Sequence, residues 1–316
     1  MTLQQLQQVI MIADCGSMNE AAKRLYVSQP NLSAVVKELE KEIGLTIFLR
    51  SNRGIRITPE GEQFIGYARQ VVEQYSLLEN KYIGRESKKI FSVSAQHYSF
   101  AVKAFVETVK RVGMDQYEFA MHETKTHTVI DNVRNMISEL GVLYLSDFNE
   151  KVLHKIFREN NLIFTELFAC DTYVYLWKNH PLAGRRSVSM DDLKDYPCLA
   201  FEQGSANSFY YAEEMKSTYE YGRIIKADDR ATMLNLMVGL NGYTLCSGII
   251  SEELNGEDYI AVPLKKSENE KMHIGFLKHK DVKLSDLGNI YIEELVRLPD
   301  PDMVSFTAEI RQRYGV

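Results

Sequence analysis

The 316 residues of the chain carry a formal net charge of −6, and 45% of them are hydrophobic while 25% are charged. This balance is typical of globular proteins, and the length predicts two or three domains. No apolar run approaches the roughly 20 residues of a membrane span, and the start lacks the basic and apolar segments of a signal peptide. We therefore expect a cytoplasmic protein without membrane contact.

Cysteine and histidine spacing argues against a disulfide framework or a metal centre. The four cysteines are far apart and form no CxxC pair: Cys15, Cys170, Cys198 and Cys246. His97, His122 and His127 have no cysteine or acidic partner at metal-ligand spacing. We expect reduced thiols, no metal and no cofactor.

Enzymatic motifs are absent from the sequence: it contains no GxxxxGK[ST], GxGxxG, HExxH or GxSxG. The acidic pairs Asp191–Asp192 and Asp228–Asp229 fit helix starts better than catalytic carboxylates. We therefore expect no enzymatic activity.

The first 43 residues predict three short helices. Thr2 with Gln5 forms a capping box, and so does Ser17 with Glu20. Only two residues separate the second helix from Ser28, which stands at the N-cap position of the third. A helix, a tight turn and a polar-faced helix together indicate a helix-turn-helix.

The third helix supplies most of the predicted DNA contacts. Leu32, Val36 and Leu39 recur at helix spacing and predict a buried face. The opposite face offers amide, hydroxyl and ammonium groups, which reach base edges and phosphates from a major groove. The candidates are Ser28, Gln29, Pro30, Asn31, Ser33 and Lys37. By itself this segment fits an ordinary surface helix better, but the preceding helix favours DNA binding.

A basic hairpin is predicted after the third helix. Residues 46–49 and 55–57 are β-prone, and Arg50, Arg53 and Arg56 lie in a stretch from 43 to 59 without any carboxylate. Residues 1–89 carry a net charge of +2, and the remainder carries −8. Because local charge governs attraction to phosphate, we expect a wing whose arginines contact the DNA backbone or a minor groove. For any single arginine, a solvated hairpin is also a sufficient explanation.

A long helix should begin at Pro59, with Thr58 as its cap. Its apolar residues alternate spacings of four and three, as in a coiled-coil seam. These residues are Phe64, Ala68, Val71, Tyr75, Leu78 and Tyr82. Such a helix needs a partner, and a second copy is the simplest one. We predict a dimerisation helix over residues 59–89, ending in a hinge.

The sequence beyond residue 89 alternates between strand and helix patterns. The expected strands are 90–94, 117–121, 141–145, 198–201, 224–227, 243–246 and 272–276. Helices are expected between them, including helices from Ser205 and Asp229 and over 285–296. This alternation implies βαβ units with a parallel sheet. The pattern repeats after about residue 165, and the last strand and helix are expected to return to the first repeat, so that two crossings create a cleft.

Polar residues at the ends of these strands predict an effector site in the cleft, because ligands of open parallel sheets bind there. The candidates are Ser94, Ala95, Gln96, His97, Lys125, Thr126, Gln203, Gly204, Ser205, Cys246 and Ser247. For any single hydroxyl, helix capping is an equally good explanation. As a set they favour a small polar, anionic effector.

Several motifs in the first 65 residues resemble the LysR-type transcriptional regulators. They are Ala21-Ala22-x-x-Leu25-x-Val27-Ser28-Gln29-Pro30-x-Leu32-Ser33, Leu39-Glu40-x-x-x-Gly44-x-x-x-Phe48-x-Arg50-x-x-Arg53 and Thr58-Pro59-x-Gly61. The remainder is similar more loosely, through Ala227-Asp228-Asp229 and the turn at 180–184. The resemblance implies an α/β protein with a winged helix-turn-helix, a dimerising helix and a two-lobed, periplasmic-binding-protein-like effector domain.

The expected domains are a DNA-binding domain (1–58), a linker helix and hinge (59–89) and an effector domain (90–300). In the effector domain, lobe I comprises 90–163 and 269–300, and lobe II comprises 164–268; residues 301–316 form a tail without an assigned role. The expected partners are double-stranded operator DNA, further copies in a homodimer or homotetramer, and a small-molecule effector. RNA polymerase is a further candidate.

Two other interpretations remain open from the sequence. One is a DNA-binding regulator whose cleft takes no small molecule. The other is a solute-binding or catalytic domain with an incidental helical module.

Overall fold

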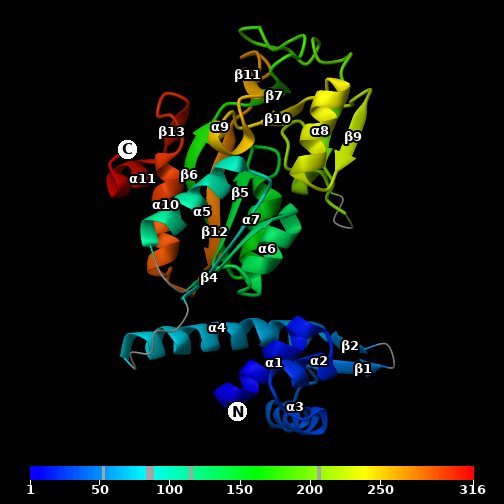
Figure 1. Cartoon of the computed structure of the whole chain (residues 1–316), viewed down its shortest axis with the longest axis vertical. Helices are drawn as coiled ribbons and strands as arrows, with labels where there is room; N and C mark the ends of the chain where they lie inside the picture. Colours follow the sequence, from blue (N-terminus) through cyan, green and yellow to red (C-terminus); the bar gives the residue numbers. More distant parts are fainter. Residues whose placement is uncertain (52–53, 83–88, 114–116, 205–207) are drawn as a thin grey trace. The chain divides into compact units, whose positions relative to one another are not determined.

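The computed structural model describes residues 1–51, 54–82, 89–113, 117–204 and 208–316 (Figure 1). The chain divides into two compact units, the first comprising residues 1–88 and 134–137 and the second residues 89–133 and 138–316. None of the helices within these described ranges combines the length and apolar character needed to cross a membrane.

The first unit is a winged helix-turn-helix followed by a long helix. Its elements are α1 (Leu3–Cys15), α2 (Met18–Arg24), α3 (Gln29–Ile43), β1 (Phe48–Ser51), β2 (Gly54–Ile57) and α4 (Pro59–Tyr82). The predicted caps are present: Thr2, Ser17 and Ser28 each accept a hydrogen bond from a first-turn amide. The buried core includes Val9, Ile12, Ala21, Leu32, Val36, Leu39, Phe48 and Ile65.

Two polar contacts fix the wing and the start of α4. The Glu40 carboxylate accepts the backbone N–H groups of Ile47 (2.7 Å) and Phe48 (3.0 Å). The Thr58 hydroxyl donates to the Thr46 carbonyl (2.6 Å) and accepts the Gly61 N–H (2.8 Å). A Cβ at Gly61 would lie 2.4 Å from the Ile47 carbonyl oxygen, so only glycine fits there. These motif residues therefore hold the domain together rather than contact a ligand.

We expect Gly61→Ala to destabilise the first unit by about 1–3 kcal/mol, because the rigid Ile47 backbone cannot make room for the added methyl group. Amide hydrogen exchange over α1 to α4 would measure the loss. Gly239→Ala is the matched control, since a Cβ at Gly239 meets nothing within 4 Å. Equal protection in both variants would contradict this packing argument.

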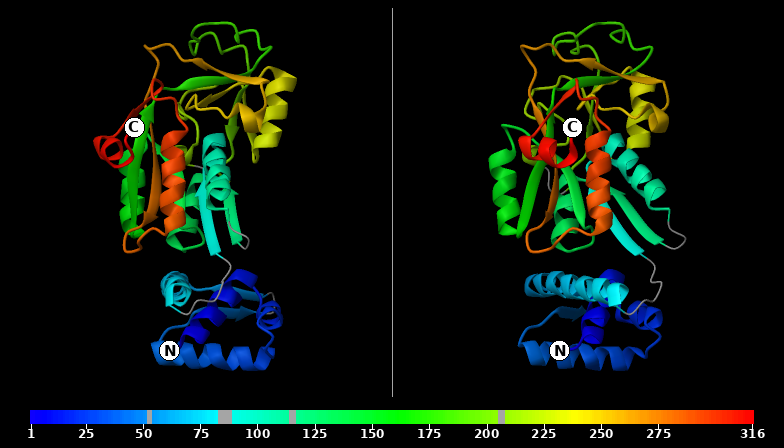
Figure 2. Two further views of the ribbon diagram at one scale, coloured as in Figure 1. Left: turned by 60° about the vertical axis from the view of Figure 1, so that its left-hand side comes forward. Right: turned by 90° about the vertical axis from the view of Figure 1, so that its left-hand side faces the viewer.

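The second unit contains a six-stranded sheet in lobe I, with the order β13-β6-β12-β5-β3-β4. The strands are β3 (Lys89–Ala95), β4 (Tyr117–Glu123), β5 (Leu140–Leu145), β6 (Leu162–Cys170), β12 (Met272–His279) and β13 (Val304–Phe306). Helices α5 (Ser99–Val112) and α10 (Asp286–Arg297) cover one face; α6 (Thr126–Arg134) and α7 (Glu150–Glu159) cover the other (Figure 2).

Lobe II contains a three-stranded antiparallel sheet and a parallel strand pair, with the orders β10-β7-β11 and β8-β9. Its strands are β7 (Tyr173–Trp177), β8 (Cys198–Phe201), β9 (Ile224–Ala227), β10 (Thr244–Cys246) and β11 (Tyr259–Pro263). Its helices are η1 (Phe209–Tyr211), α8 (Arg230–Leu240) and α9 (Glu252–Asn255). The two crossings between lobes are tied by Thr172, which donates to the Asn269 side chain (2.8 Å) and the Glu270 carbonyl (2.7 Å).

Three expectations for this unit need correction. Lobe I continues past residue 163, because β6 runs to Cys170 and pairs with β12 and β13. Residues 301–316 are not a separate tail, since β13 joins the same sheet and Ile310 of α11 (Ala308–Tyr314) is buried in its core. The lobe I sheet is also mixed rather than parallel: β3 pairs in parallel with β4 and β5, but β12, β6 and β13 pair antiparallel. The helix expected from Ser205 begins outside the described residues, and the next element is the short η1 turn.

Candidate DNA-binding and effector sites

The polar face of α3 is open to solvent. Pro30, Asn31 and Lys37 are exposed, while Gln29 and Ser33 are half-buried. Leu32, Val36 and Leu39 are fully buried on the opposite side. The exposed hydroxyl of Ser28 caps the helix by accepting the Asn31 N–H (3.4 Å). The helix therefore presents the groups that the sequence predicted for base and phosphate contacts.

The described part of the wing contains one of the three predicted arginine side chains. Arg56 is exposed on β2, opposite Leu49 of β1. Arg50 lies on β1 without a described side chain, and Arg53 lies outside the described residues. Tyr26, which the sequence analysis did not name among the candidate DNA contacts, is 96% exposed in the turn between α2 and α3, with φ of +54°. Its position, as an aromatic residue in a two-residue turn, is the feature of the sequence that could have drawn attention to it.

The predicted dimer seam divides between two environments. Phe64 packs against the core of its own winged helix, and Ala68 is buried. The seam residues Val71, Tyr75 and Leu78 are 40–57% exposed, and so are Tyr67 and Leu77, which the predicted seam did not include. The side chain of Tyr82 is not described. The apolar stripe available to a partner is therefore this exposed set of five, which we call the α4 stripe.

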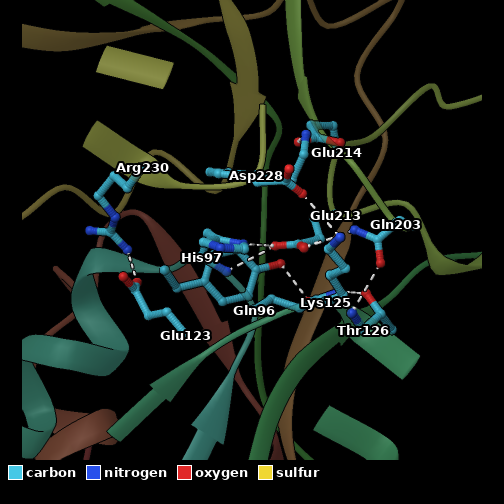
Figure 3. A network of polar contacts seen from close by, with 12 residues as sticks. Gln96, His97, Glu123, Lys125, Thr126, Gln203, Glu213, Glu214, Asp228 and Arg230 are labelled. Atoms are coloured by element: carbon cyan, nitrogen blue, oxygen red, sulfur yellow. Dashed lines mark hydrogen bonds and ion pairs between the residues drawn. The ribbon is translucent and has the colours of Figure 1, made fainter. Parts of the chain in front are cut away.

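In the second unit, five of the predicted effector residues meet between the lobes: Gln96, His97, Lys125, Thr126 and Gln203 (Figure 3). The Gln96 amide donates to the Thr126 hydroxyl (2.6 Å), and its oxygen accepts the Tyr98 hydroxyl and the Tyr144 N–H. Thr126 donates its N–H to Gln203 of lobe II (3.1 Å) and its hydroxyl to the Tyr211 carbonyl (2.7 Å). Because these polar groups already hydrogen-bond to one another, they hold the two lobes together.

At the centre of this network is Glu213, which sequence reasoning did not single out. One oxygen of its carboxylate accepts the His97 N–H (2.9 Å) and faces His97 Nδ1 at 2.8 Å; the other accepts the Gln203 amide (2.9 Å). The His97 ring stacks on Phe201 with a centroid distance of 3.8 Å. The side chains of His97 and Glu213 are only 6% and 3% exposed. Neither periodicity nor a motif marks the segment around Glu213.

Further charged pairs flank this centre. Lys125 of lobe I pairs with Asp228 of lobe II (3.0 Å), and Arg230 pairs with Glu123. Burial raises the pKa of Glu123 above its usual value, although Arg230 opposes the shift. Lys125 and Arg230 each already have an acidic partner and are not available as free cations.

Glu214, directly after Glu213, is a buried acid of a different kind. Burial, with the Glu213 charge adding to it, raises the pKa of Glu214 to about 8. Its carboxyl oxygen accepts the Phe201 N–H at 2.8 Å. The two adjacent acids therefore differ in their surroundings: three nitrogen atoms lie within hydrogen-bond distance of Glu213, whereas the Phe201 N–H is bound by Glu214. With a pKa of about 8, Glu214 retains its proton near neutral pH.

Two of the other predicted effector residues lie inside lobe I. The Ser94 hydroxyl bonds with Ser138 (2.8 Å) and Asn132 (2.9 Å) inside lobe I, and Ala95 is buried in the core. Gly204 has φ of +61° beside Lys125. Ser205 lies outside the described residues.

Cys246 and Ser247 line a pocket between the lobes with a cavity volume of about 80 Å³. Its wall combines the start of α5 with apolar side chains such as Met233 and Ile249, and Glu213 and Glu214 line it as well. Thr244, which also lines it, has a buried hydroxyl without a hydrogen-bond partner. Burial raises the pKa of the Cys246 thiol to about 12, so it remains protonated. Within the described ranges, no group of three His, Cys, Asp or Glu side chains could hold a metal ion.

Comparison with known proteins assigns the chain to a family. Residues 3–62 match the family described as bacterial regulatory helix-turn-helix protein, lysR family, and residues 115–297 match the LysR substrate binding domain. The chain belongs to the LysR family. It is a DNA-binding transcriptional regulator with a substrate-binding domain, and the predicted family and fold class are confirmed.

Individual relatives are similar over different extents. The uncharacterised HTH-type regulator YkuM of Bacillus subtilis is 37% identical over 115 residues, which span 34% of this chain and 39% of YkuM. A full-length OxyR variant from Pseudomonas aeruginosa shares the fold with a TM-score of 0.68 and 20% identity, covering 96% of this chain and 98% of that one. Full-length CbnR complexed with its target DNA has a TM-score of 0.55 and 18% identity, covering 95% and 100%.

Proposed function

We propose that the protein binds specific operator DNA as a homodimer, or as a homotetramer built from such dimers. The observation that carries this proposal is the capped helix α3, whose polar side chains face solvent in a helix-turn-helix. Such a helix can enter a major groove, where Gln29, Asn31 and Ser33 are suited to base edges and Lys37 to phosphate. The wing would add Arg56, Arg50 and Arg53. CbnR, similar in fold, is described in complex with its target DNA.

The dimer would form through the α4 stripe, because this apolar surface is exposed in one copy of the chain. Paired DNA-binding units also match the two-fold symmetry of paired half-sites. RNA polymerase would be a further partner, and the protein would act in the cytoplasm.

The second unit would respond to a small polar ligand bound between the lobes. Its support is the pocket beside Glu213, lined by Ser247, by Thr244 with its unpartnered hydroxyl and by the start of α5. A ligand that contacts both lobes shifts their equilibrium only through unequal affinity for the open and closed arrangements.

A regulator without a small-molecule effector is the second candidate. It is favoured by the side chains of Gln96, Thr126 and Gln203, which already hydrogen-bond within the chain. Thermal shifts with a panel of small carboxylates distinguish the two candidate functions. A compound that stabilises the protein and also changes its DNA footprint supports a small-molecule effector. If no compound has either effect, the regulator without an effector is supported.

Substitutions on α3 test the DNA-binding proposal. Gln29→Ala and Ser33→Ala should relax the sequence preference by about 1–3 kcal/mol per base contact, measured with a library of operator variants. Arg56→Ala should instead weaken all DNA sequences alike and reduce the salt slope by about one unit. Glu38→Ala, an exposed change on the same helix, should leave the preference intact. Unchanged preference in both Gln29→Ala and Ser33→Ala would refute the assignment of α3 to the groove.

A further inference from the structure

The interlobe site contains a cradle of three N–H donors that converge on one carboxylate. They are the backbone N–H of His97, the ring Nδ1 of His97 in the tautomer that carries its proton there, and the amide of Gln203, at 2.8–2.9 Å from the Glu213 oxygens (Figure 3). Several N–H donors aimed at both oxygens of a carboxylate provide strong, charge-assisted hydrogen bonds. We call these three donors the carboxylate cradle.

The cradle is held in position by contacts that do not involve Glu213. The Gln203 oxygen accepts the Thr126 N–H, which fixes the side on which its NH₂ group points. The His97 ring lies flat on Phe201, with an interplanar angle of 9°. The donors are therefore preorganised, as they would be in a binding site for a separate ligand.

The cradle also lies where such a ligand is expected. His97 follows the carboxyl end of β3 and precedes α5, in lobe I, at the edge where ligands of parallel strands collect. Glu213 reaches it from lobe II, in the segment after η1. The Glu213 carboxylate, which belongs to lobe II, is thus bound by the backbone N–H and the ring Nδ1 of His97, which belong to lobe I.

Glu213 differs from the simpler charged contacts between the lobes. Lys125 pairs one-to-one with Asp228, whose side chain is 66% exposed, and such rim pairs contribute little. Glu213 is buried and accepts three N–H groups. Removing a buried partner of this kind leaves its donors unsatisfied, which is costly.

We propose that Glu213 is a built-in ligand of the carboxylate cradle: the chain's own side chain occupies a carboxylate-binding site and closes the lobes without any small molecule. An external carboxylate would bind the cradle only by replacing Glu213. The regulatory consequence of this inference rests on the proposed function: a carboxylate effector must displace Glu213 from the cradle.

The test is chemical rescue of full-length Glu213→Ala, which removes the carboxylate but keeps all three donors. Its melting temperature should fall by roughly 5–10 °C, as expected when one partner of a buried polar pair is deleted. Sodium formate or acetate at tens of millimolar should restore several degrees in a saturable manner. Sodium chloride at equal ionic strength should not, and the unsubstituted protein should gain no more from formate than from chloride.

Two further variants sharpen this result. Glu220→Ala removes an exposed acid from the same segment and should show no specific response to formate. Gln203→Ala combined with Glu213→Ala removes one donor and should weaken the formate response several-fold. A purely structural role for Glu213 predicts the initial loss but no formate-specific recovery.

Equal responses of Glu213→Ala to formate, acetate and chloride would overturn the proposal. If that variant does not stay folded, its folded fraction after refolding in formate or in chloride, followed by circular dichroism, gives the same comparison: a larger fraction in formate supports the proposal, and equal fractions overturn it. No DNA is present in these measurements, so failure of the operator experiments would refute the proposed function while leaving the rescue result unaffected.

Discussion

Replacing both Val71 and Leu78 with Asp should convert the protein into a monomer that binds a full operator about 100-fold more weakly. Both side chains belong to the α4 stripe and are at least half exposed in one copy of the chain. A partner helix that covers them would enclose the introduced carboxylates without partners, which is costly. A monomer also loses the gain from engaging two linked half-sites, typically a factor of 100 or more.

Light scattering would measure the mass of each variant. Fluorescence anisotropy would measure its affinity for DNA with one half-site and with two. Ser76→Asp is the control: it adds one carboxylate to an exposed position of α4 on a different side of the helix. Affinity for a single half-site should be similar in all variants, because the winged helix itself is unchanged. A double variant that remains dimeric would place the interface elsewhere.

The seam also shows what periodicity can and cannot predict. The spacing of four and three identifies an apolar stripe on α4, but the same pattern serves partners within the chain and outside it. Phe64 and Ala68 are covered by their own winged helix, whereas Val71 and Leu78 are not. Only the length of α1 and its packing against α4 decide where intramolecular burial ends.

Helix starts were predictable because their signals are local. Ser28 precedes α3 and Asp229 precedes α8, and each accepts an amide of the first turn. A cap acts within four residues, so the sequence contains the whole interaction. The strand from 90 was expected for a similar reason, since a short apolar run already indicates a buried strand.

The site was only partly predictable because its central contact is not local. Gln96, His97, Thr126 and Gln203 follow strands, and the rule that ligands gather at strand ends was enough to select them. His97 and Glu213 are 116 residues apart in the sequence, and Glu213 stands in an irregular segment. Chain packing alone brings its carboxylate to the cradle, so no spacing rule would find it.

Glu214→Gln should stabilise the protein at pH 8 and flatten the fall in stability between pH 5 and pH 8. Burial and the neighbouring Glu213 charge raise the pKa of Glu214 to about 8 from its usual value of 4.5, while the Phe201 N–H and Lys226 oppose the shift. The folded protein therefore binds a proton at this site that the unfolded chain releases above pH 4.5. Stability must then decline as the pH rises between these values, by at most about 1.4 kcal/mol per pH unit from this group.

Glutamine keeps an oxygen for the Phe201 N–H but has no proton to lose, so it removes this contribution. The difference in unfolding free energy between the variant and the unsubstituted protein should be small near pH 4.5, grow with pH and level off above pH 8. Urea unfolding at pH 5, 6.5 and 8 would measure it. Glu202→Gln, an exposed acid beside Phe201, should change stability by the same small amount at all three pH values. Parallel pH profiles for Glu214→Gln and the unsubstituted protein would show that Glu214 is already ionised at pH 5, and the buried carboxyl would then need a cationic partner to hold its charge.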